Sequence, residues 1–265
     1  MMTWIVCYIV LGAAVGFLAG LLGIGGGLLI VPMLTILFTA QGFPPEYILH
    51  MALGTSLASI MFTSVSSLWS HHKKNAVIWT VLFSITPGII IGTFLGSFIA
   101  ARLSTGFLKG FFSVFLYYVA TQMLLGMKPK PARTTPGTPG MIAAGGVIGA
   151  FSSLVGIGGG SLSVPFLVWC NAGMHKAIGT SAAIGFPIAV AGGIGYILNG
   201  LKVSGLPEHT LGFVHLTALV GIAAASVLTA PWGAALAHRL PVDRLKKLFA
   251  FLLYVLGTRM LVSLM

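Results

Sequence analysis

Two stretches of the chain, GAAVGFLAGLLGIGGGLLIVPML (residues 12–34) and GGVIGAFSSLVGIGGGSLSVPFL (residues 145–167), follow one pattern. Each is an apolar run interrupted near its middle by G-I-G-G-G, and a proline follows five residues after the last glycine. Glycine costs a helix interior about 1 kcal/mol relative to alanine. Three glycines in a row therefore predict that each stretch is two helical segments joined by a glycine turn.

The composition places these runs in a membrane. Of the 265 residues, 57% are apolar and 6% are charged, and the mean hydropathy is +1.04. A soluble domain carries about a quarter charged residues, so a soluble enzyme is excluded. Long unbroken apolar runs also exclude a transmembrane β-barrel. Residues 3–22 lack the basic start and the cleavage site of a signal peptide and are expected to remain as the first helix. The prediction is an all-α, polytopic integral membrane protein.

The similarity between the two halves extends beyond the glycine runs. HMALGTS (50–56) returns as HKAIGTS (175–181), and GSFIAARL (96–103) returns as GAALAHRL (233–240). The duplication predicts a first membrane repeat over residues 1–127 and a second over residues 141–265. Residues 128–140, which are rich in proline, are expected to form a solvated linker between them.

Each repeat is expected to contain one glycine-broken segment, over residues 3–40 or 141–169, and three further spans. Each span has close to the 20 or so residues that a bilayer requires. The expected spans are 47–69, 76–101, 107–127, 176–198, 212–237 and 245–264. Small residues at helical spacing, such as Gly88, Gly92 and Gly96, predict close helix packing rather than a functional role.

The basic residues bear on the orientation of the repeats. The chain has 14 Lys and Arg against 3 Asp and Glu, a net charge of +11, and most of the basic residues lie between apolar runs. The positive-inside rule accounts for them, so no nucleic-acid partner is expected. With the loop at 69–75 inside, parallel repeats would place seven Lys and Arg on each side, whereas an inverted second repeat places ten inside and four outside. The count favours inverted repeats, as in many secondary transporters. Each glycine-broken segment would then be re-entrant or cross as two short helices.

The glycine turns are candidate anion sites. In hydrocarbon, broken backbone is tolerated only where protein buries it or where it lines a wet cavity. A helix restarting near residues 29–31 would hold Pro32 in its first turn, where a missing N–H costs little, and Pro165 repeats this arrangement. The free N–H groups of such a helix start attract an anion without a charged side chain. A tight turn with nothing bound is the alternative. The candidate binding residues are Gly25, Gly26, Gly27, Gly158, Gly159, Gly160 and Ser161.

Two G-T-S triplets open the next span of each repeat. Thr55 and Ser56 in the first, and Thr180 and Ser181 in the second, either bond back to their own helix or donate to anion oxygens beside the glycine turns. The second interpretation makes all four candidate binding residues.

The histidines offer a weaker signal. His50 and His175 stand four residues before the two G-T-S sites, and they are either interfacial anchors or groups that carry protons and act in gating. His215 is expected inside a span and has no counterpart in the first repeat.

No pattern in the chain indicates catalysis. There is no nucleophile–base pair, no metal-ligand motif, no P-loop and no G-x-G-x-x-G, so no catalytic residue, metal or cofactor is predicted and an ATP-driven pump is excluded. Glu46, Glu208 and Asp243 lie in loops or at span edges. A cation carrier would normally offer a carboxylate inside the membrane, so the absence of one favours an anion.

At LAGLLGIGGGLLIVPML (18–34), LVGIGGGSLSVPFL (154–167) and the two G-T-S sites, the sequence resembles the TauE/SafE family of membrane permeases. The resemblance spans both halves, and the doubled G-x-G-G-G-x₄-P pattern is fairly specific. It implies a bacterial-type plasma (inner) membrane location and a small, often sulfur-containing anion as substrate, such as sulfite, thiosulfate, a sulfonate or sulfoacetate. It also implies that the anion lies near the two glycine triplets, with the G-T-S hydroxyl groups alongside.

The sequence therefore predicts a permease, not an enzyme, that moves a small anion across the lipid bilayer by alternating access. A passive anion channel with the same site and a non-transporting subunit of a larger membrane assembly are the alternatives. The identity of the anion, the direction of transport, the coupling ion, the number of full spans and the formation of a homo-oligomer stay open.

Overall fold

The computed structural model describes residues 2–22, 26–126, 134–237 and 242–263, and within these ranges the chain is almost entirely helical. The elements are α1 (Met2–Leu22), α2 (Gly27–Ala40), α3 (Ile48–Lys73), α4 (Trp79–Arg102), α5 (Thr105–Leu124), α6 (Thr138–Val155), α7 (Gly160–Trp169), α8 (Met174–Gly200), β1 (Thr210–Leu211), β2 (Val214–His215), α9 (Leu216–Ala237) and α10 (Val242–Val262). All six predicted spans coincide with a helix to within four residues at either end.

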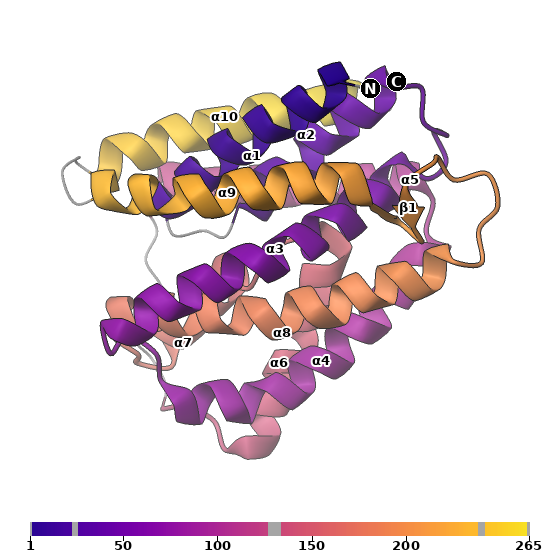
Figure 1. The fold of residues 1–265 in the computed structure, drawn as a ribbon. Coiled ribbons are helices and arrows are strands. Elements are labelled where there is room, and N and C mark those ends of the chain that lie inside the picture. The colour runs from indigo at the N-terminus through magenta and orange to yellow at the C-terminus, as the bar shows by residue number, and fades with distance from the viewer. Residues whose placement is uncertain (1, 23–25, 127–133, 238–241, 264–265) are drawn as a thin grey trace.

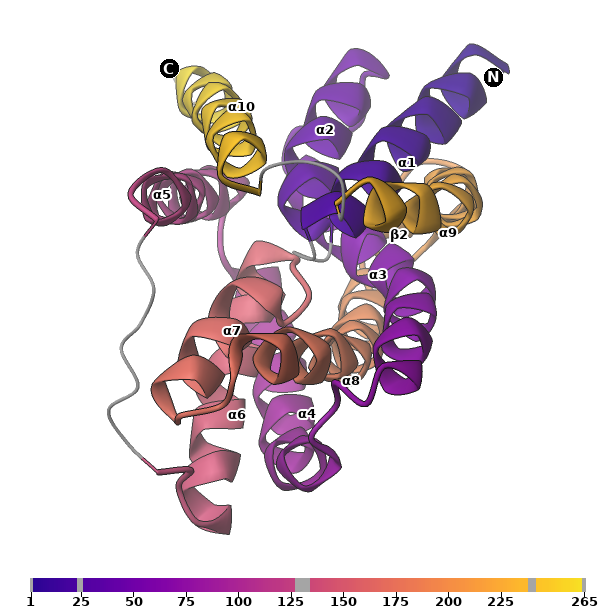
Figure 2. The same cartoon turned by 90° about the vertical axis from the view of Figure 1, so that its left-hand side faces the viewer.

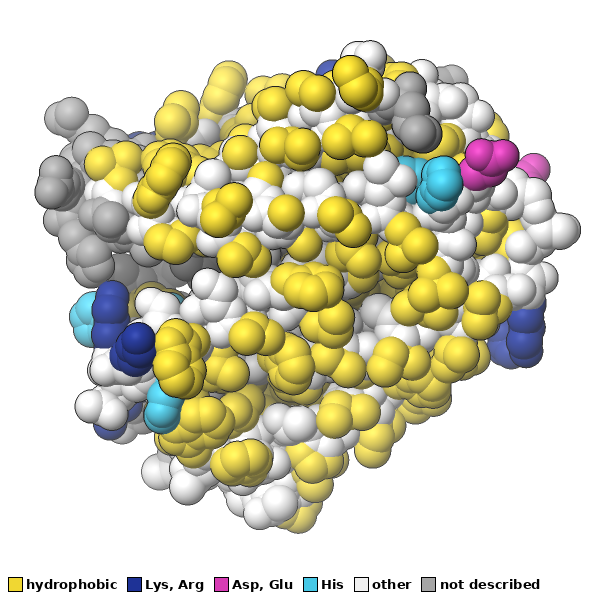
Figure 3. Space-filling view, viewed as in Figure 1, with side chains coloured by type: hydrophobic (Ala, Val, Ile, Leu, Met, Phe, Trp, Pro, Cys, Tyr) yellow, Lys and Arg dark blue, Asp and Glu magenta, His cyan; other side chains and the backbone are white. Residues whose placement is uncertain are grey.

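The described helices are those of a membrane protein. Seven of them, namely α1, α3, α4, α5, α6, α8 and α9, are long and apolar enough to cross a bilayer. The helices that follow the glycine runs, α2 and α7, are shorter, at 14 and 10 residues. Figure 3 shows apolar side chains across the middle of one face and charged side chains at its two ends. The prediction of an all-α, multi-pass integral membrane protein is confirmed.

Both glycine runs break the helix, as predicted. Gly26 has the left-handed backbone conformation, with φ 65°, immediately before α2. Gly156 has the same conformation, with φ 64°, where α6 ends. Glycine adopts this conformation without steric cost. The predicted position of the prolines was wrong. Because α2 and α7 begin at Gly27 and Gly160, Pro32 and Pro165 are the sixth residues of their helices and not first-turn residues.

Helices from the two halves of the chain pack in pairs. α1 lies along α9 and α4 lies along α6, while α3 packs against α8 and α5 against α10 (Figure 2). α1 begins and α10 ends at one end of the bundle, which we call the terminal end, and α3 ends, α8 begins and α9 ends at the opposite end (Figure 1). We call this opposite end the Lys73 end.

Glycine rows bring the paired helices into backbone contact. A Cβ atom at Gly92 would overlap the carbonyl group of Gly146, and one at Gly88 would overlap that of Ile142. On the other pair, a Cβ atom at Gly12 would lie 2.6 Å from the carbonyl oxygen of Ile222. The packing role predicted for the small residues is confirmed, because close approach of helix backbones requires them.

Aromatic rings cluster at the terminal end of the bundle, where α1 begins. The ring centroids of Tyr8, Phe38 and Phe43 lie 5.7, 5.5 and 5.3 Å from that of His215. His215 was expected inside a span, and this prediction was wrong. It lies in β2, directly before α9. Its Nδ1 accepts a hydrogen bond from the N–H of Ala218 at 3.2 Å, so the imidazole caps the start of α9. We call the rings around His215 the aromatic cluster.

We predict that α4 and α6 tolerate a methyl group at Gly146 but not at Gly92. Gly92→Ala forces the two backbones apart and should lower the free energy of unfolding by about 1–3 kcal/mol. Gly146→Ala is the matched control, because its Cβ atom would lie 3.8 Å from the nearest carbonyl oxygen, that of Gly88. Thermal unfolding of both variants in detergent checks this, and equal midpoints would contradict the packing described.

The histidine cap predicts a loss of stability in acid. Burial, followed by the charge of His209, lowers the pKa of His215 to about 4. Between pH ~6.5, the unfolded pKa, and pH 4 the unfolded chain binds more protons than the folded one, so stability falls as the pH is lowered through this window. His215→Asn keeps a neutral acceptor and should flatten this dependence. The unfolding midpoint from pH 8 to 4.5 measures it, with exposed His72→Asn as the control. A variant that keeps the wild-type slope would show that another group is responsible.

Candidate functional site

A cavity of about 170 Å³ lies between the two glycine turns. The turns contribute Gly26, Gly158, Gly159 and Gly160 to its lining, and α1, α2, α3, α8 and α9 supply the remaining walls. A buried water needs about 10–15 Å³ of such space, so the cavity can hold a small oxyanion together with water. The two glycine runs, 133 residues apart in the sequence, therefore face one space.

The two turns also touch each other. A Cβ atom at Gly27 would lie 2.7 Å from the carbonyl oxygen of Gly156 and 2.9 Å from Cα of Ile157. Ile60, the middle residue of α3, contacts both turns, at 3.0 Å from that Cβ position at Gly27 and 3.4 Å from one at Gly158. The turns thus meet halfway along a helix that is long enough to span the membrane.

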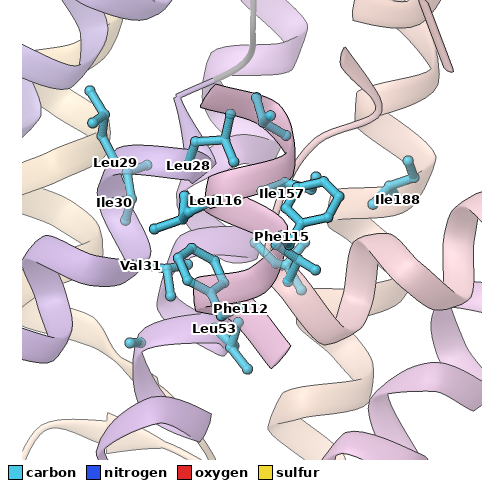
Figure 4. Close-up of a cluster of buried hydrophobic side chains, with 14 of the residues drawn as sticks. Leu28, Leu29, Ile30, Val31, Leu53, Phe112, Phe115, Leu116, Ile157 and Ile188 are labelled. Atoms are coloured by element: carbon cyan, nitrogen blue, oxygen red, sulfur yellow. The ribbon is translucent and has the colours of Figure 1, made fainter. Parts of the chain in front are cut away.

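Protein, not lipid, surrounds the outer side of this junction. Figure 4 shows Leu28 and Val31 of α2 and Ile157 pointing into an apolar cluster that includes Phe112 and Leu116 of α5. These five side chains are at most 1% exposed. The broken backbone is therefore buried on one side and lines a cavity on the other, as broken helices in hydrocarbon require.

Buried hydroxyl groups without partners lie at the second turn. Ser181 lines the cavity and is 1% exposed, and its hydroxyl has no hydrogen-bond partner among the described residues. The hydroxyl groups of Ser161 and Ser163, in the first turn of α7, are likewise buried and unpartnered within the described part of the chain. A buried hydroxyl without a partner costs about 1–3 kcal/mol. Of the three serines only Ser181 is among the described lining residues of the cavity, and the predicted binding residue Ser161 is not.

A glycine of α8 leaves open space beside an amide group of the turn. A Cβ atom at Gly185 would lie 3.8 Å from the backbone nitrogen of Gly159 and 3.8 Å from Cβ of Ser64, with nothing closer. The first N–H groups of α7 have no partner within their own helix. The cavity therefore offers amide and hydroxyl donors around a space into which a side chain at Gly185 would project.

The remaining G-T-S residues lie outside the cavity. Thr55 Oγ1 accepts a hydrogen bond from the N–H of His215 at 3.0 Å, and Thr180 Oγ1 accepts one from the N–H of Ile78 at 2.9 Å. Each threonine thus holds the segment that leads into α9 or α4 from the other half of the chain. Ser56 donates to the carbonyl oxygen of Gly156 at 2.8 Å. Gly25 falls outside the described residues.

The paired histidines occupy different environments, and neither lines the cavity. His50 is buried, and its Nε2 donates to the carbonyl oxygens of Ala100 and Leu103, each at 3.1 Å, where α4 ends. His175 is exposed in the first turn of α8.

The cavity also contains residues that were not predicted. One wall is a row of α3 side chains that carry hydroxyl groups, and His71 lies at its outer end. The row consists of Thr63, Ser64, Ser66, Ser67 and Ser70. Five hydroxyl residues within eight positions of an apolar span are visible in the sequence and could have indicated a wet helix face. None of the described lining residues is acidic.

Comparisons with known proteins agree with this architecture. A family model described as "Sulfite exporter TauE/SafE" matches residues 8–260. A "Probable membrane transporter protein" of Haemophilus influenzae is 38% identical over 261 residues, which cover 98% of this chain and 99% of the relative. Similarly named proteins of Methanocaldococcus jannaschii and Bacillus subtilis are 29% and 28% identical, over 84% and 87% of this chain and 80% and 89% of their own. No solved structure matches.

The family resemblance of the glycine runs is confirmed, since the match covers both of them and both G-T-S sites. With its membrane-spanning helices, its central cavity and a match over nearly its whole length, the chain belongs to the sulfite exporter TauE/SafE family of membrane transporters.

Proposed function

We propose that this transporter is a permease for a small, sulfur-containing oxyanion such as sulfite, thiosulfate or a sulfonate, and that it has no catalytic role. The sulfur in this proposal comes from the description of the family model. That the substrate is negatively charged is inferred from the cavity, because its described lining offers amide and hydroxyl donors and no acidic group.

The observation that carries the proposal is the meeting of two helix starts and an unpartnered hydroxyl at one space. The N-termini of α2 and α7 both follow glycines that line the cavity, and the lining residue Ser181 has a buried hydroxyl without a partner among the described residues. Helix N-termini attract anions through free N–H groups and the positive end of the helix dipole. Neutral donors also let the anion leave, which a transporter requires.

We assign the candidate residues two roles. Gly25–Gly27, Gly158–Gly160, Ser161 and Ser181 are proposed to bind the anion. Thr55, Ser56 and Thr180 are proposed to position the site, since each already bonds to backbone of the opposite half. His50 is proposed to hold the end of α4, and the exposed His175 to anchor at the membrane surface.

We further propose that the anion moves by alternating access, because the described cavity extends toward one end only. It runs along α3 to exposed Ser70 at the Lys73 end. Further along α8, beyond the lining residue Gly185, the helix is tightly packed. A Cβ atom at Gly192 would lie 2.7 Å from Leu57 and 3.1 Å from Thr93, and one at Gly195 would overlap Ser97. The aromatic cluster fills the far end. This arrangement supports a state that is open toward the Lys73 end.

Inverted repeats over residues 1–127 and 141–265 would supply the opposite state. In the repeat, α1 corresponds to α6 and α9 corresponds to α4, so the α1–α9 pair is the counterpart of the α6–α4 pair. Both pairs are present and closely packed. The positive-inside count puts the Lys73 end in the cytoplasm, so we propose that the state described faces inward.

The function predicts saturable, exchanging flux. In liposomes holding the purified protein, uptake of labelled sulfite, thiosulfate or a sulfonate should saturate, and unlabelled anion inside should accelerate it. Repeating the uptake with and without a pH gradient tests coupling to protons. Flux that neither saturates nor shows counterflow would indicate a channel, and no flux of any of the three anions would contradict the proposed substrate class.

The site predicts a selective effect of one methyl group. Gly185→Ala introduces no overlap but places its methyl group 3.8 Å from the backbone nitrogen of Gly159, where it would displace the anion. We expect kcat/KM to fall at least about tenfold, which corresponds to about 1.4 kcal/mol, with an unchanged unfolding midpoint.

Gly193→Ala is the matched control for this experiment. Gly193 lies on the same helix with equally open surroundings, 3.9 Å from the backbone of Ala58, but outside the described cavity lining. Equal transport by the two variants would argue against the site.

A further inference from the structure

We propose that the outer part of the hydroxyl row of α3 is a second oxyanion subsite, which binds the substrate between the membrane surface at the Lys73 end and the glycine turns. The subsite consists of Ser66, Ser67 and Ser70, with His71 at its outer end. This proposal rests on the permease function above and adds to it a binding step on one side of the membrane only.

The hydroxyl groups of the row differ in how they are satisfied. Thr63 and Ser64, nearest the turns, donate to carbonyl oxygens of their own helix, those of Ile60 and Met61. No hydrogen-bond partner is found in the described part of the chain for the hydroxyl groups of Ser66, Ser67 or Ser70, although all three line the cavity. These groups are therefore free to donate to a passing anion in place of its water.

The row connects two places that attract anions. At its inner end lie the amide groups of the second turn and Ser181, a lining residue whose buried hydroxyl has no hydrogen-bond partner among the described residues. At its outer end α3 finishes in His71, His72 and Lys73, and Lys74 follows. A helix rises about 1.5 Å per residue, so an anion at Ser70 would lie roughly 15 Å along α3 from Ile60.

The second half of the chain has no such row. With the 125-residue offset that relates the two G-T-S sites, Ser66, Ser67 and Ser70 correspond to Ala191, Gly192 and Gly195 of α8. Gly192 and Gly195 are packed against α3 and α4 and carry no donor side chain. The hydroxyl row therefore lies only on the path from the cavity to the Lys73 end. Its loss should affect an anion that arrives from the Lys73 end and not one that arrives from the other side of the membrane.

A comparison of the two sides of the membrane tests this. Initial rates of sulfite and thiosulfate uptake are measured in inside-out vesicles and in right-side-out vesicles for Ser67→Ala/Ser70→Ala. With the Lys73 end on the cytoplasmic side, the KM in inside-out vesicles should rise about three- to tenfold, the scale of one lost hydrogen bond. The KM in right-side-out vesicles and the unfolding midpoint should stay unchanged.

Two further variants serve as controls. Ser67→Thr/Ser70→Thr keeps the hydroxyl groups and should restore the wild-type KM. Ser84→Ala removes a hydroxyl from α4 that bonds to Thr80 outside the described cavity lining and should change neither KM.

The outcomes separate this proposal from the function itself. An unchanged KM on both sides, or an equal rise on both, would overturn the one-sided subsite while wild-type flux left the permease intact. A rise confined to right-side-out vesicles would overturn the proposed sidedness. Wild-type vesicles that transport neither anion would overturn the substrate class, and the subsite with it.

Discussion

Backbone N–H and C=O groups in hydrocarbon must find partners inside the protein, and this constraint determines the centre of the molecule. A chain that breaks two helices at glycine turns cannot expose either turn to lipid. The solution observed is to press the turns together, Gly27 against Gly156, at the middle of α3. Apolar side chains of α2 and α5 cover the outer side, and the cavity takes the inner side. The anion site we propose is thus a by-product of where broken backbone can be accommodated.

The two halves depend on each other for the same reason. Thr55 and Thr180 each accept an N–H from the segment that leads into α9 or α4 of the opposite half. Ser56 bonds to the carbonyl group of the opposite turn, whereas Ser181, its counterpart in the sequence, has no partner in the described chain. Equivalent hydroxyl groups of the two triplets therefore differ in their hydrogen bonding. The unpartnered one, that of Ser181, belongs to a residue that lines the cavity.

Much of this architecture follows from local sequence. Apolar length gave the helices, and glycine triplets gave the breaks, because both effects act within a few residues. The predicted start of α2 was too late, because Gly26 takes up the left-handed turn conformation and the helix begins directly after it, at Gly27. Tertiary contacts decide which G-T-S hydroxyl groups are free, and helix propensity carries no information about them. The hydroxyl row of α3 was visible in the sequence. Only the structure shows that it faces a cavity, because α1 and α9, which form other walls of that cavity, are distant in the sequence.

The glycine rows of α1–α9 and α4–α6 have a mechanical consequence. Where backbones touch with no side chains between them, as at Gly92 and Gly146 or Gly12 and Ile222, the two helices cannot slide or tilt without collision. Each pair should therefore move as one rigid body. Any large displacement must then fall at the boundary between these pairs and the central α3–α8 pair, and not within either pair.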